Sequence, residues 1–168
     1  MSSFDRRRFL VGPPALIAAA VLSGCGFTQA YGPSGSAGKL LNAVEVSEPK
    51  GRAGYLMTRE LEDRLGRAGQ PRYALVYAIE VSETPVAISR LNLITRYNML
   101  GKVTYALNDL ATDQVLTSGT VDNFTSFAAS DTTVATEAAR RAAEERIVVI
   151  LSDQVVARLV AAADSFET

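Results

Sequence analysis

The chain has 168 residues, a formal net charge of −1 at neutral pH, a single cysteine and no histidine. The lack of histidine excludes Ser-His-Asp and Cys-His catalysis, His-ligated zinc and an imidazole acid or base near neutral pH. The near-neutral charge excludes a generic nucleic-acid binder, and the length and the hydrophobic content of 48% suit one domain with a real core.

Residues 1–24 have the parts of a bacterial export signal. Arginines at positions 6–8 precede an apolar run over residues 9–22, which leads into Leu22-Ser23-Gly24-Cys25. The run is shorter than the about 18 apolar residues of a spanning helix, and Pro13-Pro14 interrupts it. We therefore predict a lipoprotein signal peptide over residues 1–24, cleavage before Cys25, and acylation of its thiol as a membrane anchor. The arginines fit a twin-arginine signal and an ordinary basic n-region equally well, so both export routes stay open.

The mature chain would have 144 residues with 14 basic and 17 acidic side chains, because residues 1–24 contain three arginines and one aspartate. The stretch Tyr31-Gly32-Pro33-Ser34-Gly35-Ser36-Ala37-Gly38 is typical of a flexible linker. We expect a lipidated N-terminus and linker over residues 25–39 and a folded domain over residues 40–168.

The domain is predicted to begin with a short strand and an amphipathic helix. Residues 41–46 have strand character and end at Ser47-Glu48-Pro49. Between about residues 52 and 67, Met57, Leu61 and Leu65 recur at helical spacing, and glycines and a proline follow as a stop signal.

From residue 72 the hydrophobic period changes from 3.6 to 2, which indicates strands. The first strand is expected to end at Ser82-Glu83-Thr84-Pro85, and a longer strand is expected over residues 90–107. Its apolar face would include Leu91 and Leu93, and its polar face would carry Arg90, Arg96 and Lys102. Residues 108–113 turn the chain back, and residues 114–127 are predicted to be the antiparallel partner.

The last predicted element is a helix over residues 132–163, a stretch without proline or glycine, with Ser130 and Asp131 as candidate N-caps. Its expected buried stripe consists of Ala135, Ala138, Ala142, Val149, Val156, Leu159, Val160 and Ala163. This order of elements predicts an α+β two-layer sandwich, in which a mainly antiparallel four-stranded sheet has two helices packed on one face. The other face is left to water or to a partner.

Carboxylates are the remaining candidates for chemistry, and they occur in clusters such as Glu60, Glu62 and Asp63 or Glu144 and Glu145. Each cluster lies on a predicted helix among arginines, which favours an ion-paired helix face. We therefore predict no catalytic residue, no metal site and no cofactor.

The combined pattern resembles the LptE family of lipopolysaccharide-assembly lipoproteins. Gly24-Cys25-Gly26-Phe27 and the following Tyr31-Gly32 are similar to the family's cleavage region, with Gln29-Ala30 in place of its Pro-Leu. The order of elements, with Arg96-Tyr97 in the long strand and Glu144-Glu145-Arg146-Ile147 in the last helix, extends the resemblance over nearly the whole mature chain. The resemblance implies an outer-membrane lipoprotein that acts, without catalysis, as plug and assembly partner of the LptD β-barrel in lipopolysaccharide transport.

Under this resemblance, Arg90, Arg96 and Lys102 are the candidate ligand-binding residues, because an anionic lipopolysaccharide calls for positive charge. Solubilising charges on an open sheet face would explain the same residues. Gly26 after the anchor cysteine favours the outer membrane, because an aspartate there marks inner-membrane retention in enteric bacteria. An alternative function is that of an auxiliary lipoprotein of a lipid-transporting ABC system.

Overall fold

The computed structural model describes residues 35–130 and 132–166. The predicted signal peptide and the predicted anchor Cys25 lie outside these residues. The elements in chain order are the 3-10 helix η1 (Ser36–Lys39), β1 (Val44–Val46), α2 (Gly51–Leu65), β2 (Tyr73–Ile88), β3 (Ile94–Asp109), β4 (Val115–Ala128), α3 (Thr133–Ala162) and the 3-10 helix η2 (Ala163–Ser165).

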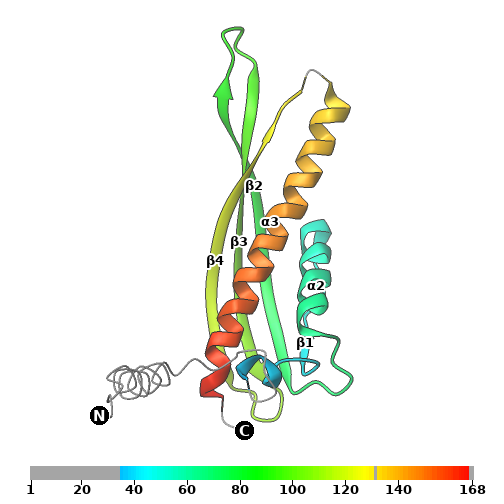
Figure 1. Ribbon diagram of the computed structural model, residues 1–168, viewed down its shortest axis with the longest axis vertical. Coiled ribbons are helices and arrows are strands. Elements are labelled where there is room, and N and C mark those ends of the chain that lie inside the picture. Colours follow the sequence, from blue (N-terminus) through cyan, green and yellow to red (C-terminus); the bar gives the residue numbers. More distant parts are fainter. Residues whose placement is uncertain (1–34, 131, 167–168) are drawn as a thin grey trace, which may run out of the picture.

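The strands form one sheet in the order β1-β2-β3-β4. β1 runs parallel to β2, whereas β2, β3 and β4 form an antiparallel meander. α3 packs against β3, β4 and α2, and the β2–β3 turn lies at the opposite end of the molecule from η1 and η2 (Figure 1). The predicted α+β fold, a mainly antiparallel four-stranded sheet with two helices, is confirmed.

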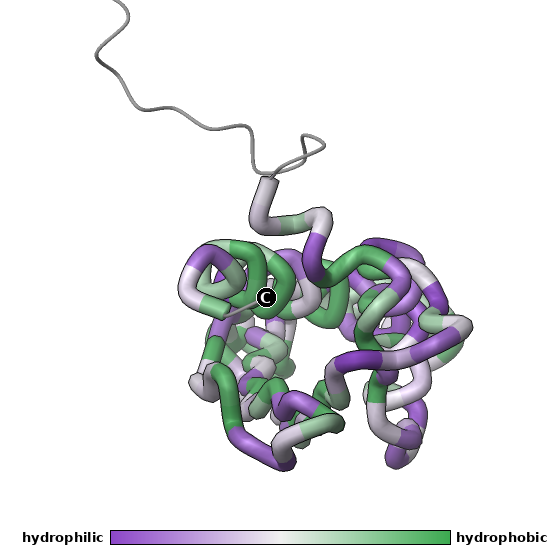
Figure 2. Tube along the Cα trace, turned by 90° about the horizontal axis from the view of Figure 1, so that it is seen from below, coloured by the Kyte–Doolittle hydropathy of each residue, from purple (hydrophilic) through white to green (hydrophobic). Residues whose placement is uncertain are grey.

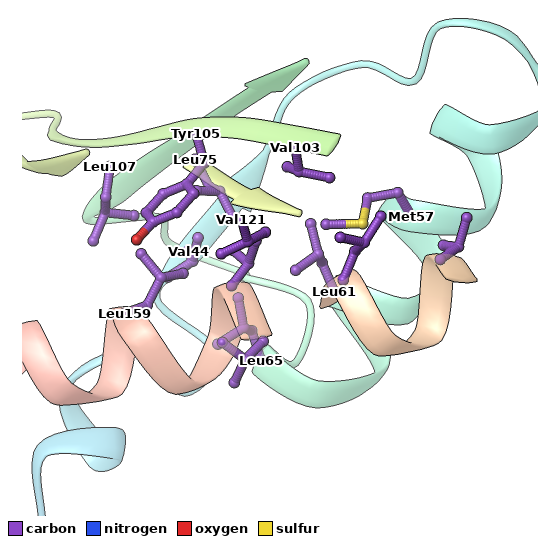
Figure 3. Packing of buried hydrophobic residues seen from close by; sticks show 14 of the residues in the cluster. Val44, Met57, Leu61, Leu65, Leu75, Val103, Tyr105, Leu107, Val121 and Leu159 are labelled. Carbon is purple, nitrogen blue, oxygen red and sulfur yellow. The ribbon is translucent and has the colours of Figure 1, made fainter. Parts of the chain in front are cut away.

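The hydrophobic core lies between the sheet and the helices. Met99, Val103 and Leu107 of β3 are fully buried, as are Ile147 and Leu151 of α3. Side chains from the strands, α2 and α3 meet in this layer (Figure 3). A view along the long axis shows hydrophobic and hydrophilic stretches alternating along the chain, as expected for strands and helices with one buried face (Figure 2).

Gly101 in β3 allows α3 to approach the sheet closely. A Cβ atom at this position would lie 2.6 Å from Leu151 Cδ1 and 2.8 Å from Ile147 Cγ1. Since real Cβ contacts are essentially never this short, the absence of a side chain at residue 101 sets the distance between the two layers.

The first turns of α3 differ from the prediction. Thr132 is the N-cap, and its hydroxyl accepts a hydrogen bond from the Ala135 N–H at 3.3 Å. Ser130 therefore does not cap the helix, and Asp131 lies outside the described residues.

The predicted buried stripe of α3 is wrong in its N-terminal half. Ala135, Ala138 and Ala142 are exposed, and burial along the helix begins at Ala143. Alanine offers little apolar area, so the larger Ile147 and Leu151 decide which face of the helix is buried.

The folded domain starts earlier than the predicted boundary at residue 40. Ser36 and Ala37, which were expected in the linker, are buried in η1. Lys39 Nζ donates a hydrogen bond to the Phe166 carbonyl oxygen at 2.9 Å. The small residues that indicate a linker by composition instead allow η1 to pack closely on the core.

Candidate functional site

The sheet face opposite the helices carries an apolar row. Leu100 of β3 pairs with Ser82 of β2 on one side and with Phe124 of β4 on the other. The exposed fractions are 43% for Leu100 and 61% for Phe124. This row makes the open face a candidate contact surface, since both side chains are large, apolar and exposed.

Lys102 lies in the next row, between two carboxylates. Its register partners are Glu80 of β2 and Asp122 of β4, and all three residues are exposed. Opposite charges in cross-strand positions attract each other, and here two carboxylates outweigh one ammonium group. The row is therefore net negative, and Lys102 is poorly placed to receive an anionic ligand.

Arg96 has a different environment on the same face of β3. Its register partners are Ala87 of β2 and Ala128 of β4, so no opposite charge lies beside it in the sheet. Six residues separate Arg96 from Lys102, which corresponds to about 20 Å along a strand. A single phosphate group cannot contact both side chains.

Arg90 does not lie on the long strand, contrary to the prediction. It is in the β2–β3 turn, and β3 begins only at Ile94. The Ser89 hydroxyl accepts hydrogen bonds from the N–H groups of Leu91 at 3.3 Å and Leu93 at 3.2 Å. Asn92 adopts a φ of 60°, a left-handed conformation in which asparagine is enriched. The chain therefore reverses at residues 89–93.

The turn was predicted too early because Pro85 lies inside β2. β1 pairs only with Tyr73–Leu75, so β2 is an edge strand at Pro85, and edge strands tolerate proline. The register shifts between Pro85 and Ala87, as in a β-bulge. As a consequence, Leu91 and Leu93 are exposed in the turn instead of lying on the core face.

The β2–β3 turn is basic. The sequence has no aspartate or glutamate between Glu83 and Asp109. Arg90 and Arg96 are consequently the only charged residues between positions 84 and 98. Of the three predicted ligand residues, these two lie toward the same end of the sheet, whereas Lys102 belongs to the net negative row.

An ion pair links the N-terminal end of α3 to β2. Arg140 Nη1 lies 3.5 Å from Glu83 Oε1. The guanidinium of Arg140 also donates to Glu137 at 2.8 Å, and Arg141 donates to the same carboxylate at 3.0 Å. These hydrogen bonds, that of Arg140 foremost, lower the pKa of Glu137 to about 2.

The predicted carboxylate clusters form ion pairs. Glu144 and Glu145 of α3 contact Arg52 of α2 at 3.1 and 3.2 Å. Glu60 accepts a hydrogen bond from Arg64 at 2.8 Å, which is the main cause of its lowered pKa. These contacts connect α2 with α3 and place charged side chains on the outer surfaces of both helices.

Within residues 35–130 and 132–166, no group of three or more His, Cys, Asp or Glu side chains could hold a metal ion. The helices of the same ranges include none that is both long and apolar enough to span a bilayer.

Residues 41–159 match the profile of the family described as LptE: Lipopolysaccharide-assembly. The chain belongs to the LptE family. This match covers more than half of the sequence and confirms the resemblance found in its motifs. The open sheet face, Arg96 and the β2–β3 turn all lie within the matched residues.

Solved structures show the same fold at low sequence identity. A protein from Caulobacter crescentus CB15, named as a candidate lipoprotein, has a TM-score of 0.65 at 22% identity and covers 79% of this chain and 100% of its own. Lipoprotein B from Nitrosomonas europaea has a TM-score of 0.57 at 13% identity, covering 73% and 84%. Rare lipoprotein B from Shewanella oneidensis has a TM-score of 0.56 at 9% identity, covering 71% and 92%. A search of curated proteins gives no match.

Proposed function

We propose that this LptE-family protein is a non-catalytic, lipid-anchored protein of the outer membrane. In this proposal it occupies the lumen of the LptD β-barrel as a plug, assists the assembly of the barrel and helps to deliver lipopolysaccharide to the cell surface. Acylated Cys25 holds it at the membrane. The observation that carries the proposal is the family match over residues 41–159.

The shape of the sheet supports a plug. β2 and β3 have 16 residues each, which corresponds to a length of about 50 Å. A bilayer with its headgroups is about 40–45 Å thick, so the sheet is long enough to extend through a barrel. The lumen of such a barrel is polar, which suits a face that carries Thr104, Thr120 and the Lys102 row around its apolar contacts.

The charge distribution supports contact with lipopolysaccharide at the β2–β3 turn. Arg90 and Arg96 have no acidic neighbour in the sequence between positions 84 and 108. Arginine binds phosphate groups in a bidentate manner, and lipopolysaccharide is anionic. We therefore place the ligand contact at these two arginines and exclude Lys102 from it.

Co-purification tests the partner. Tagged protein extracted gently from membranes should bring LptD with it, and recovery as a free monomer would contradict the plug. A photoreactive phenylalanine at position 124 should cross-link to the barrel, and the same probe at position 55 is a matched control on α2, since Phe124 and Tyr55 are both 61% exposed. Depletion of the protein should reduce surface lipopolysaccharide, whereas a normal surface level would favour the ABC-system alternative.

Charge reversal tests the ligand contact. Arg90→Glu and Arg96→Glu should each lower cross-linking to lipopolysaccharide, because they replace an attractive charge with a repulsive one. Lys102→Glu is the control on the same strand and should have little effect, since its row is already net negative. Equal loss in all three variants, or no loss in any, would refute the assignment of the two arginines.

A further inference from the structure

The β2–β3 turn is the most apolar exposed end of the described structure. Five large aliphatic side chains are exposed within nine residues: Val86 at 48%, Ile88 at 62%, Leu91 at 80%, Leu93 at 62% and Ile94 at 38%. Leu91 and Leu93 belong to the turn and the other three to the adjoining strand ends, and this end of β2 and β3 is one extremity of the molecule (Figure 1). A concentration of exposed apolar side chains of this kind marks a contact surface.

The turn is held in a defined conformation that keeps these side chains outside the core. The Ser89 N–H donates to the Leu93 carbonyl oxygen at 2.7 Å, and the Asn92 N–H donates to the Ser89 carbonyl oxygen at 3.0 Å. β4 supports the base of the turn, where the Ala129 N–H donates to the Thr95 carbonyl oxygen at 3.0 Å. The exposure of Leu91 and Leu93 is therefore a property of the folded turn.

Charge and shape indicate which kind of partner fits. Arg90 and Arg96 are the only charged residues between positions 84 and 98, and the paired β4 residues 125–128 carry no charge. A hairpin end is convex, so a rigid protein would need a complementary groove to enclose it. A fluid acyl layer closes around a convex aliphatic tip without one, and the phosphates above that layer attract arginine.

We propose that the β2–β3 turn inserts its aliphatic side chains into the interface of an anionic phospholipid bilayer, with Arg90 and Arg96 at the level of the phosphates. The aliphatic groups leave water, and the arginine stems reach along the acyl boundary while their guanidinium groups stay among the headgroups. This inference goes beyond the plug function, because it requires only a bilayer and neither LptD nor lipopolysaccharide.

The position of the turn adds a second attachment at the far end of the domain. The predicted anchor Cys25 precedes η1, and η1 and the turn lie at opposite ends of the molecule (Figure 1). The anchor also raises the local concentration of the turn at the bilayer, so weak insertion suffices.

An introduced tryptophan can report the insertion without background, because the natural chain contains no tryptophan. The lipidated mature protein carrying Leu91→Trp is reconstituted into phosphatidylglycerol and phosphatidylcholine vesicles whose acyl chains are brominated. We expect a blue shift of the emission and quenching by the brominated chains. Tyr55→Trp, at a residue of α2 that is 61% exposed, is the control and should remain unquenched. Leu93→Trp is the second reporter in case Leu91→Trp disturbs the turn.

The charge requirement is tested in the same vesicles. Adding Arg90→Gln and Arg96→Gln to the reporter should weaken the insertion equilibrium about 30-fold, as follows from the usual contribution of two basic side chains near an anionic surface. Emission of both turn reporters that is as unquenched as that of Tyr55→Trp would overturn the inference. A blue shift without quenching would also overturn it, since the turn would then be covered by protein. Insertion into pure phosphatidylcholine vesicles that is as strong as insertion into the anionic vesicles would refute the anionic bilayer as the partner. Insertion that the two glutamine substitutions do not weaken would refute it as well.

Discussion

Replacing Gly101 by alanine tests whether the missing side chain in β3 sets the position of α3. The new Cβ would lie 2.6 Å from Leu151 Cδ1 and 2.8 Å from Ile147 Cγ1. Both neighbours are fully buried, so neither side chain can move into solvent. Overpacking of this kind costs about 1–3 kcal/mol, and the lower entropy of the unfolded chain with alanine returns about 0.4–1 kcal/mol.

We therefore expect Gly101→Ala to lower the free energy of unfolding by about 1–2 kcal/mol. For a domain of this size the melting temperature should fall by about 3–10 °C, which circular dichroism can follow during thermal unfolding. Gly69→Ala is the matched control, because a Cβ at residue 69 would meet no atom within 4 Å. It should leave the melting temperature nearly unchanged.

A double-mutant cycle makes the test specific to the contact with α3. Leu151→Ala alone should cost about 2–5 kcal/mol, because it leaves a cavity in the core. In combination with Gly101→Ala the loss should be smaller than the sum of the two, since the new methyl group occupies part of that cavity. Strict additivity, together with a Gly101→Ala melting temperature equal to that of Gly69→Ala, would refute the close approach of the two layers.

Three further predictions concern the N-cap of α3, the charge of its first turns and the contact between α2 and β2. Thr132→Ala removes the side-chain cap and should cost about 1 kcal/mol in urea unfolding, and an unchanged midpoint would contradict the cap. Because the pKa of Glu137 is lowered in the folded state, its ionised carboxylate stabilises the fold fully above pH 4.5, and this stabilisation is lost as the pH falls through about 2. Glu137→Gln should remove that part of the pH dependence. A Glu137 carboxyl group that titrates near its ordinary pKa in NMR would refute the lowered value. Burial raises the pKa of Tyr77, whose hydroxyl donates to the Gly54 carbonyl oxygen at 2.8 Å. Tyr77→Phe should therefore cost about 1 kcal/mol, and it should remove a step above the ordinary tyrosine range from the absorbance titration.

The element types and the fold class could be predicted from the sequence because they depend on local periodicity. Tyr73, Leu75 and Tyr77 alternate with less buried residues, whereas Met57 and Leu61 are spaced by four. These periods identify strand and helix without knowledge of the partners. The family motifs and the single cysteine added the expectation of a lipoprotein.

The details of the candidate site could not be predicted because they depend on tertiary arrangement. Pro85 is a turn signal by composition, and it lies inside β2 only because β1 is too short to reach it. Likewise, strand register places Lys102 between Glu80 and Asp122, and no local pattern of residues specifies that register. The exposed Leu91 fits an apolar strand face equally well until the turn is located.

The contact between the two ends of the domain has a consequence for the order in which the fold is completed. Lys39 in η1 binds the carbonyl oxygen of Phe166, 127 residues later in the chain. The ring of Phe166 also packs on Tyr73, with 5.9 Å between the ring centroids. This contact joins residues near the start and the end of the folded domain, so it can form only when the whole domain is available to fold. Contacts with so large a sequence separation form slowly, so we expect the first residues of the domain to become ordered late in folding.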